Sequence, residues 1–218
     1  WLFTSERLSV QVHPDDAQAR ERGLARGKTE CWYIVDAEPG ATIGLGLVRQ
    51  VGEDDLRAAA LDGSIEDLLD WRPVRAGEFF IVPPGTIHAI GEGLTLIEFQ
   101  QNADVTYRLY DYGRPRELHL DDAVAVARRE PYPSELTTTV SDTPMTLVSG
   151  PQFTLVQGVG GAAPAGALAD RRRWGISVDG GVRSGDEEAR PGECLSIQPH
   201  AGLDFSEARV LIGADGPI

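Results

Sequence analysis

Residues 77–92, which read GEFFIVPPGTIHAIGE, decide the fold class of this chain. A short apolar run ends at a Pro-Pro-Gly turn, and a second short run that carries His88 follows it. Short apolar runs bounded by proline and glycine are typical of strands joined by tight turns. The pattern returns along the chain, which contains 25 glycines and 14 prolines in 218 residues. We therefore expect a mainly β protein rather than a helical bundle.

Length and charge limit the possible functions. A chain of 218 residues can form one large core or two small ones. Its formal net charge of −14 disfavours nucleic acid as a partner, and a phosphorylated substrate would need a local basic pocket. No apolar run is long enough to cross a membrane, and no secretory signal is present. Cys31 and Cys194 form no disulfide framework, which favours the cytoplasm.

Two segments interrupt the strand pattern with helical periodicity. Residues 53–71 predict a helical insertion of two short helices, the first with Asp54 as its N-cap. Residues 118–130 predict a further helix, with Asp121 as its N-cap and two arginines at its end. We expect both segments to pack against strands.

The chain contains an internal echo. AGEFFIVPPGTIHAI and the later PGECLSIQPHAGLDF share a Gly-Glu turn, a strand and a proline turn. When the two are aligned on Gly77 and Gly192, the position of His88 falls on Leu203. We interpret the second stretch as a plain copy that keeps the backbone pattern and loses the histidine.

The echo and the linker PYPSE suggest two domains. We expect a first, larger β domain at residues 1–130, with the helical insertion at about 53–71. A second, smaller β domain without metal should occupy residues 131–218.

Strand alternation brings metal-ligating side chains together. Gln11 and His13 share one face of their strand, and Lys28 and Glu30 share one face of theirs. His88 follows a rigid turn that can aim it inward. Two nitrogen and two oxygen donors could therefore close around one divalent ion: Gln11, His13, Glu30 and His88. Histidine and carboxylate suit zinc, iron or manganese.

The other two histidines are expected to be structural. His119 starts a predicted helix, and His200 lies in the plain copy without a second histidine nearby. Each proposed ligand also has an ordinary alternative, since a lone histidine on a strand or turn is usually a hydrogen-bonded structural residue. The metal hypothesis therefore rests on the set and not on any one member.

A second polar face follows in the segment IEFQQNADVTYRLYDYGR. If the segment is fully extended, alternate residues from Glu98 to Arg108 form one polar face that includes Asp104. Asp104 and Arg108 would be an acid–base and anion-binding pair if this face lines a pocket. The alternative is a solvated outer face, which is common in antiparallel sheets.

Lys28 is the only lysine of the chain, and every other cationic side chain is an arginine. Arginine stays charged at any working pH, whereas lysine is a compact charge whose pKa can fall when it is buried near a metal. Lys28 could then carry a proton at neutral pH. The alternative is chance, since a single lysine must fall somewhere.

Several of these stretches, taken together, resemble a known family. GEFFIVPPGTIHAIGE is similar to the second motif of the cupin superfamily. SVQVHPDD, GKTECWYI, GTIHAIGEG and ADVTYRLYDYGR, in this order, resemble the type I phosphomannose isomerases, also called mannose-6-phosphate isomerases. The resemblance covers about residues 8–120, and the family also has a helical insertion at the place of residues 53–71.

The resemblance implies a cupin-type β-barrel (jelly roll) followed by a smaller, metal-free, cupin-like domain. It implies one zinc ion per chain, held by the four residues Gln11, His13, Glu30 and His88. Arg108 matches a catalytic position, and Lys28 and Asp104 match positions used for proton handling or substrate binding. The family normally has further residues before the first of these motifs, so we expect N-terminal residues ahead of Trp1.

The implied reaction interconverts mannose 6-phosphate and fructose 6-phosphate through a cis-enediolate. We expect the substrate phosphate to lie among the few cations of the pocket, including Arg114. Two other functions stay open, a non-catalytic sugar-phosphate-binding cupin and a metal-dependent cupin dioxygenase. Dioxygenase sites usually have an H-x-H pair, and here Gln11 stands in place of the first histidine.

Overall fold

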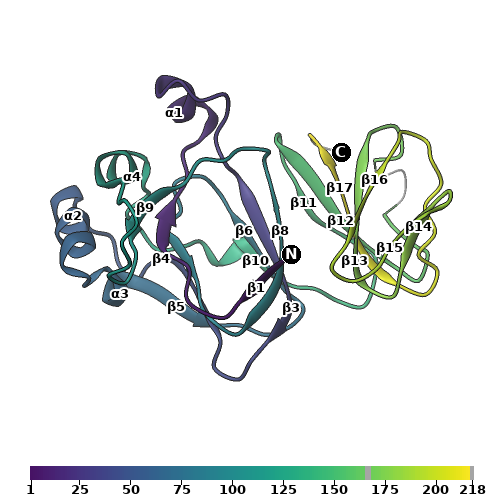
Figure 1. Cartoon of the computed structure of the whole chain (residues 1–218), viewed down its shortest axis with the longest axis horizontal. Helices are drawn as coiled ribbons and strands as arrows, with labels where there is room; N and C mark the ends of the chain where they lie inside the picture. The colour runs from purple at the N-terminus through teal and green to yellow at the C-terminus, as the bar shows by residue number, and fades with distance from the viewer. Residues whose placement is uncertain (165–167, 217–218) are drawn as a thin grey trace. The chain divides into compact units, whose positions relative to one another are not determined.

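The computed structural model describes residues 1–164 and 168–216. It divides into two compact units, Leu2–Thr137 and Thr138–Ile218. Antiparallel sheets make up both units, which confirms the expected mainly β class (Figure 1). No helix within the described residues has both the length and the apolar character needed to cross a membrane.

Two five-stranded sheets form the first unit. One has the order β1 (Leu2–Thr4), β8 (Leu94–Gln100), β3 (Glu30–Ala37), β6 (Glu78–Val82) and β10 (Thr137–Thr139). The other has the order β5 (Leu69–Pro73), β4 (Thr42–Leu47), β7 (His88–Ile90), β2 (Val10–Val12) and β9 (Tyr107–Tyr110). The turn at Gly40, which has a φ of 90°, carries the chain from β3 in one sheet to β4 in the other.

The interior between these sheets is an apolar cluster to which both contribute. β3 and β6 supply Trp32, Ile34, Phe80 and Val82, while β4 and β7 supply Ile43, Leu45 and Ile90. Since side chains alternate along a strand, each inward residue is followed by one that faces the other side of its sheet. This alternation decides which polar residues share the barrel interior.

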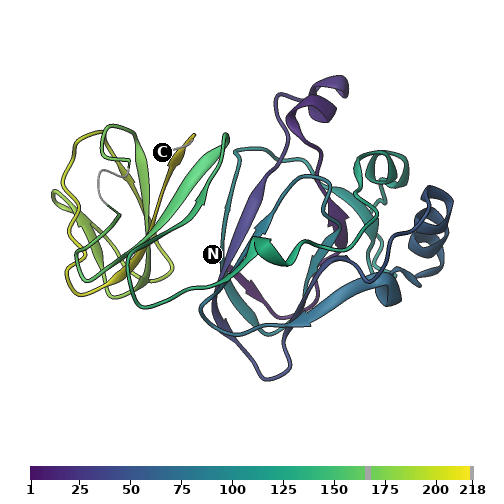
Figure 2. The ribbon, with the colours of Figure 1, turned by 180° about the vertical axis from the view of Figure 1, so that it is seen from behind.

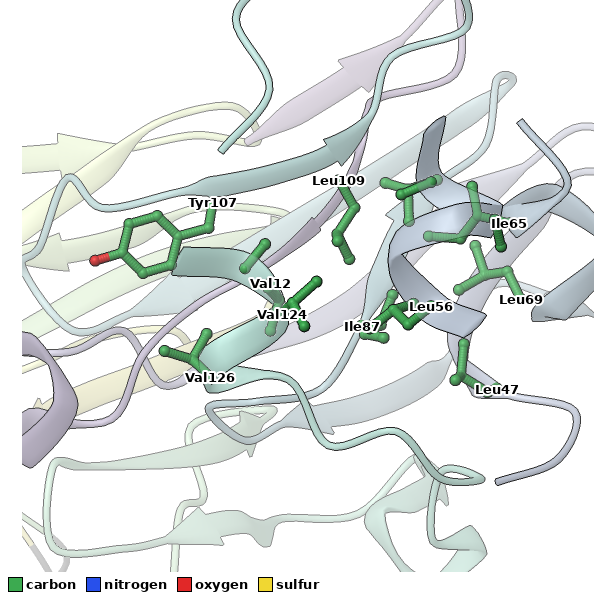
Figure 3. Packing of buried hydrophobic residues seen from close by; sticks show 14 of the residues in the cluster. Val12, Leu47, Leu56, Ile65, Leu69, Ile87, Tyr107, Leu109, Val124 and Val126 are labelled. Carbon is green, nitrogen blue, oxygen red and sulfur yellow. The ribbon is translucent and has the colours of Figure 1, made fainter. Parts of the chain in front are cut away.

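Three helices cover the outer face of the second of these sheets. They are α2 (Glu53–Asp62), α3 (Ile65–Leu68) and α4 (Leu120–Val126). Figures 1 and 2 show them gathered on one side of the first unit, beside β9 and β5. Their apolar residues pack on the outward residues of the sheet, and Figure 3 labels ten members of this cluster. The helical insertion therefore supports the strands from outside the barrel.

The helix boundaries differ from the predicted ones. The insertion ends at Leu68, because β5 begins at Leu69, so the predicted end at residue 71 is wrong. The expected N-caps Asp54 and Asp121 are also wrong, since Gly52 and His119 occupy those positions without a side-chain hydrogen bond. The acidic residues instead lie in the first turns, where the helix dipole favours them.

A short helix, α1 (Asp16–Glu21), follows β2. Asp15 caps it and shares a reciprocal capping box with Gln18. In Figures 1 and 2 this helix lies apart from the other three.

The second unit contains a five-stranded sheet and a two-stranded one. The larger has the order β11 (Met145–Ser149), β12 (Phe153–Val159), β17 (Arg209–Asp215), β13 (Arg173–Asp179) and β16 (Cys194–Ile197). The smaller pairs β14 (Val182–Ser184) with β15 (Glu187–Ala189). A 3-10 turn, η1 (Ser134–Leu136), comes before the strands of the second unit in the chain and belongs to the first unit.

The echoed turn has the same geometry in both units. Gly77 and Gly192 both have positive φ angles, 84° and 95°. The Glu78 carboxylate accepts a hydrogen bond from the backbone N–H of Arg75 at 2.8 Å. The Glu193 carboxylate accepts the matching bond from Arg190 at 2.9 Å. A shared turn therefore leads into β6 and into β16.

Candidate metal centre

A row of three side chains crosses β7, β2 and β9 on the inner face of their sheet. Gln11 stands opposite His88 on one side and opposite Arg108 on the other. Directly opposed residues on neighbouring strands point to the same face. The outward neighbours Val10 and Ile87 belong to the cluster under the helices, so the row faces the barrel interior.

Glu30 reaches the same interior from the facing sheet, where it stands opposite Val82 on β6. Lys28 lies two residues earlier, and its backbone N–H donates to the Pro14 carbonyl at 3.0 Å. Gly27 permits this approach, because a Cβ on it would lie 2.4 Å from the Pro14 oxygen. The contact brings Lys28 close to His13, and no sequence pattern had indicated this role for Gly27.

The predicted ligands meet in one buried group. His13, Glu30 and His88 are at most 2% exposed, and one ligand atom from each lies within 4.8 Å of the others. Glu30 Oε2 lies 3.4 Å from His13 Nε2, and Glu30 Oε1 lies 3.2 Å from His88 Nε2. The Gln11 amide nitrogen is 3.2 Å from His88 Nε2, so all four predicted residues are neighbours.

Hydrogen bonds behind the histidines decide which ring atoms face the centre. His13 Nδ1 lies 2.8 Å from the Val105 carbonyl, and His88 Nδ1 lies 2.9 Å from the Thr86 carbonyl. A carbonyl can only accept, so each Nδ1 carries the proton and each Nε2 presents a lone pair. This is the arrangement that orients metal-binding histidines in proteins.

The protonation states of His88 and Glu30 are those that metal ligands need. Burial lowers the pKa of His88 to about 4, which keeps its ring neutral. Burial acts to raise the pKa of Glu30, but His88, His13 and Lys28 outweigh it, so the pKa is lowered. Among the described residues, neither Glu30 oxygen has a hydrogen bond of regular geometry, although the Lys28 ammonium lies 2.9 Å from Oε2. Two ring lone pairs and a buried carboxylate thus face one another, and this donor set fits a divalent cation.

Lys28 connects this group to Glu98, which was not predicted from the sequence as a site residue. Its ammonium lies 2.9 Å from Glu30 Oε2, 3.3 Å from Glu98 Oε1 and 3.5 Å from His13 Nε2. Burial acts to lower the pKa of Lys28, but Glu30 and Glu98 outweigh it and the net shift is upward. The protein groups alone thus shift this pKa in the direction opposite to the expected fall.

Glu98 stands opposite Trp32 on the inner face of β8. Burial and the charge of Glu30 raise its pKa, although Lys28 opposes them. The alternation that selected Arg108 also contained Glu98, and this shared parity was the missed signal.

The segment from Glu98 to Arg108 is not one extended strand. β8 ends at Gln100, and β9 begins at Tyr107 in the other sheet. Between them, the Gln100 side chain donates to the carbonyls of Gln101 and Ala103 and stabilises a loop. Asp104 is exposed in this loop. The continuous polar face is therefore wrong as a geometry, although Glu98 and Arg108 both face inward.

Arg108 is held from behind by the chain that leads into α4. Its backbone N–H donates to His119 Nδ1 at 3.2 Å, and its Nη1 donates to the Glu117 carbonyl at 2.7 Å. Its Nε is buried and has no partner among the described residues. His119 thus has a structural position behind Arg108, as expected of it.

Arg114 already has protein partners. Its guanidinium lies 2.7 Å from Asp111, which is 2% exposed, and 3.3 Å from the exposed Glu6. Arg116 pairs with the same Asp111 at 2.6 Å. These contacts fasten the turn after β9.

Two other expectations concern residues outside the cluster. Cys31 is fully buried on the opposite face of β3 from Glu30, and burial raises the pKa of its thiol well above the ordinary value. His200 is exposed in the second unit and is not part of the metal-ligating group.

Comparison with known proteins places these residues in a wider context. No family model matches the chain. Over 131 residues, the chain is 45% identical to the mannose-6-phosphate isomerase of Streptococcus mutans, covering 57% of this chain and 41% of that protein. A mannose-6-phosphate isomerase of Bacillus subtilis is also 45% identical, over 133 residues, with 57% and 42% covered. The chain thus spans about two fifths of the length of these curated relatives.

Solved structures match a larger part of the chain. The mannose 6-phosphate isomerase from Bacillus subtilis has a TM-score of 0.76 and 29% identity, covering 96% of this chain and 72% of that one. A phosphomannose isomerase from Salmonella typhimurium, in a mutant form, has a TM-score of 0.71 at 16% identity, covering 99% and 77%. These likenesses confirm the expected cupin-type fold.

Proposed function

We propose that this chain, which is similar to the type I phosphomannose isomerases, interconverts mannose 6-phosphate and fructose 6-phosphate. The observation that carries the proposal is the buried group of ring lone pairs and carboxylate, with Lys28 and Arg108 at its edge. An aldose–ketose isomerase needs a polarised pair of sugar oxygens and a group that moves one proton between adjacent carbons.

We assign one zinc ion per chain to this group, held by His13, Glu30, His88 and Gln11. When bound, the ion would supply Lewis acidity toward the sugar oxygens. Gln11 would ligate through its amide oxygen, which requires the amide to turn so that the oxygen replaces the nitrogen facing His88. The Ser9 hydroxyl lies 3.4 Å from the Gln11 amide oxygen and can donate or accept in either orientation.

The side chains beside the ligands can supply the proton chemistry. The Lys28 ammonium can donate a proton, and the Glu98 carboxylate 3.3 Å away can receive one. Arg108, on the strand next to Gln11, can stabilise negative charge that develops on a substrate oxygen during passage through the cis-enediolate. Asp104 stays a candidate for proton handling from its exposed loop.

The substrate phosphate requires cations, and Arg114 stays our candidate. It can exchange its contact with the exposed Glu6 for a phosphate while keeping Asp111. Bidentate binding to phosphate is a typical use of a guanidinium.

A coupled assay tests the proposal. With zinc added, the protein should convert mannose 6-phosphate to fructose 6-phosphate, and the activity should disappear with a chelator and return with zinc. Sugar-phosphate binding without turnover, in protein with a full complement of metal, would replace the isomerase by a binding protein. Oxygen uptake by iron-loaded protein would instead indicate a dioxygenase.

A further inference from the structure

The second unit places a buried arginine at the position that corresponds to Glu30. Glu30 stands opposite Val82, and Arg173 stands opposite Ile197. Val82 and Ile197 each lie five residues after the glycine of the shared turn. β3 is flanked by β8 and β6, and β13 is likewise flanked by β17 and β16. Register and strand order therefore give the same equivalence.

A second pair of contacts supports this alignment independently. In the first unit, Trp32 meets the edge of His88, with ring centroids 5.4 Å apart. Two residues after Arg173, Gly175 takes the place of Trp32, and a Cβ on it would lie 3.9 Å from Leu203. The echo aligns Leu203 with His88, so the same two positions are neighbours in both units.

Arg173 is the first residue of β13, and its position lies on the inner face of the sheet. Gly175 shares that face, and its Cβ would lie 2.9 Å from Ile197 and 3.5 Å from Val182, which are both members of the apolar cluster of the second unit. Arg173 itself is only 7% exposed. A guanidinium therefore lies in the part of the fold where the first unit has its carboxylate.

The guanidinium is incompletely satisfied. Its Nη2 donates to the Ala201 carbonyl at 2.6 Å, and its buried Nε has no hydrogen-bond partner within residues 1–164 and 168–216. No carboxylate forms an ion pair with it among the described residues. By contrast, the neighbouring Arg171 donates to the Asp215 carbonyl and lies 3.8 Å from Asp170. A buried cation without a counter-charge is costly, and a guanidinium stays protonated at any working pH.

We propose that Arg173 is the centre of an oxyanion-binding site in the second unit, where the ligand is a phosphate group or a carboxylate. Two oxygens of such a ligand match the fork formed by Nε and a terminal nitrogen of the guanidinium. The site cannot hold a divalent cation, because Arg173 repels it and Leu203 offers no donor. The inference does not depend on the reaction proposed for the first unit.

Calorimetric titration tests the site directly. Inorganic phosphate and acetate are titrated in separate experiments at constant ionic strength, with chloride as the reference anion. We expect saturable binding of at least one of them, and at least tenfold weaker binding in Arg173→Met. The two titrations distinguish a phosphate ligand from a carboxylate.

Three control variants separate this site from others. Arg172→Met removes an exposed arginine next to Arg173 and should leave anion binding unchanged. Arg108→Ala removes the cation beside the metal group and should leave the part of the anion binding that depends on Arg173 unchanged. Arg173→Lys keeps the charge but loses the fork, so it should weaken binding even if Arg173→Met fails to fold.

Hydrogen exchange locates the bound anion. Phosphate or acetate should slow exchange of the amides in β13 and β16, and this protection should be absent in Arg173→Met. Equal binding by wild type and both Arg173 variants would overturn the proposal, as would no binding beyond that of chloride. Protection confined to β2, β3 and β7 would assign the anion to the first unit instead.

Discussion

Glu30 on β3 and Arg173 on β13 occupy matching places in the two units but have opposite charges. Around Glu30 the interior contains two histidines, a lysine and a second carboxylate. Around Arg173 the matching interior contains glycine and leucine. The turn and the strand register are the same in both units, so the backbone does not decide the chemistry. The charge of one inward side chain, on β3 in the first unit and on β13 in the second, distinguishes the proposed cation site from the proposed anion site.

The largest effect is expected from removing the charge of Glu30. Glu30→Gln should lose the metal and reduce activity by at least about 100-fold, because the ligand set loses its only anion. Metal content after dialysis and the coupled assay measure the two losses. His200→Ala, in the second unit, should keep both, and a metal-free His200→Ala would show that the two units are wrongly aligned.

Lys28→Arg tests whether any cation suffices beside Glu30. We expect turnover to fall by about 10²–10⁴-fold with metal content unchanged, because a guanidinium cannot transfer a proton and is larger than the ammonium between Glu30 and Glu98. Steady-state kinetics and metal analysis on the same sample provide the test. Near wild-type kcat and KM would remove the proton-handling role from Lys28.

Arg108→Ala tests the cation that the first unit places next to Gln11. The variant should keep its metal and lose about 10²–10³-fold in kcat, the effect of removing one charge-stabilising donor. If KM rises and kcat is unchanged, Arg108 makes the same contact in the ground and transition states and is a binding residue.

Asp111 contrasts with Arg173, since it is a buried charge that has partners. Burial acts to raise the pKa of Asp111, but Arg116 and Arg114 outweigh it and lower the pKa. Asp111→Asn should therefore lower the free energy of unfolding by about 1.5–3 kcal/mol near neutral pH. The wild-type contribution is complete above the unfolded pKa of about 3.9 and is lost as pH falls through the lower folded value. Urea unfolding of both proteins from pH 7 down to about pH 3 measures it, and a difference that grows on acidification would contradict the assignment.

The smallest effect is expected at Arg173 in chloride buffer. Arg173→Met should leave the free energy of unfolding unchanged or raise it by up to about 2 kcal/mol, because an unpaired buried charge gives way to an apolar side chain of similar length. The same variant should become the less stable one when the bound oxyanion is present. A large loss of stability in chloride would make Arg173 a structural residue instead.

The sequence alone was enough to predict the mainly β class, the helical insertion and the four residues that meet at the candidate metal centre. Alternation along short strands decides on which face of the sheet the side chains of Gln11, Glu30 and His88 lie. This alternation is a local property of the backbone. The Gly-Glu turn is equally local, so the echo between the two units is visible in the order of the residues alone.

Other features arise only from contacts between distant segments. The sequence could not show that Glu98 reaches Lys28, that the segment after Gln100 breaks into a loop, or that Gly27 lies against Pro14. It also could not show that Arg173 corresponds to Glu30, because that equivalence is defined by cross-strand register. Alternation along the chain determines which face a side chain takes, whereas strand pairing in the folded protein determines what it meets on that face.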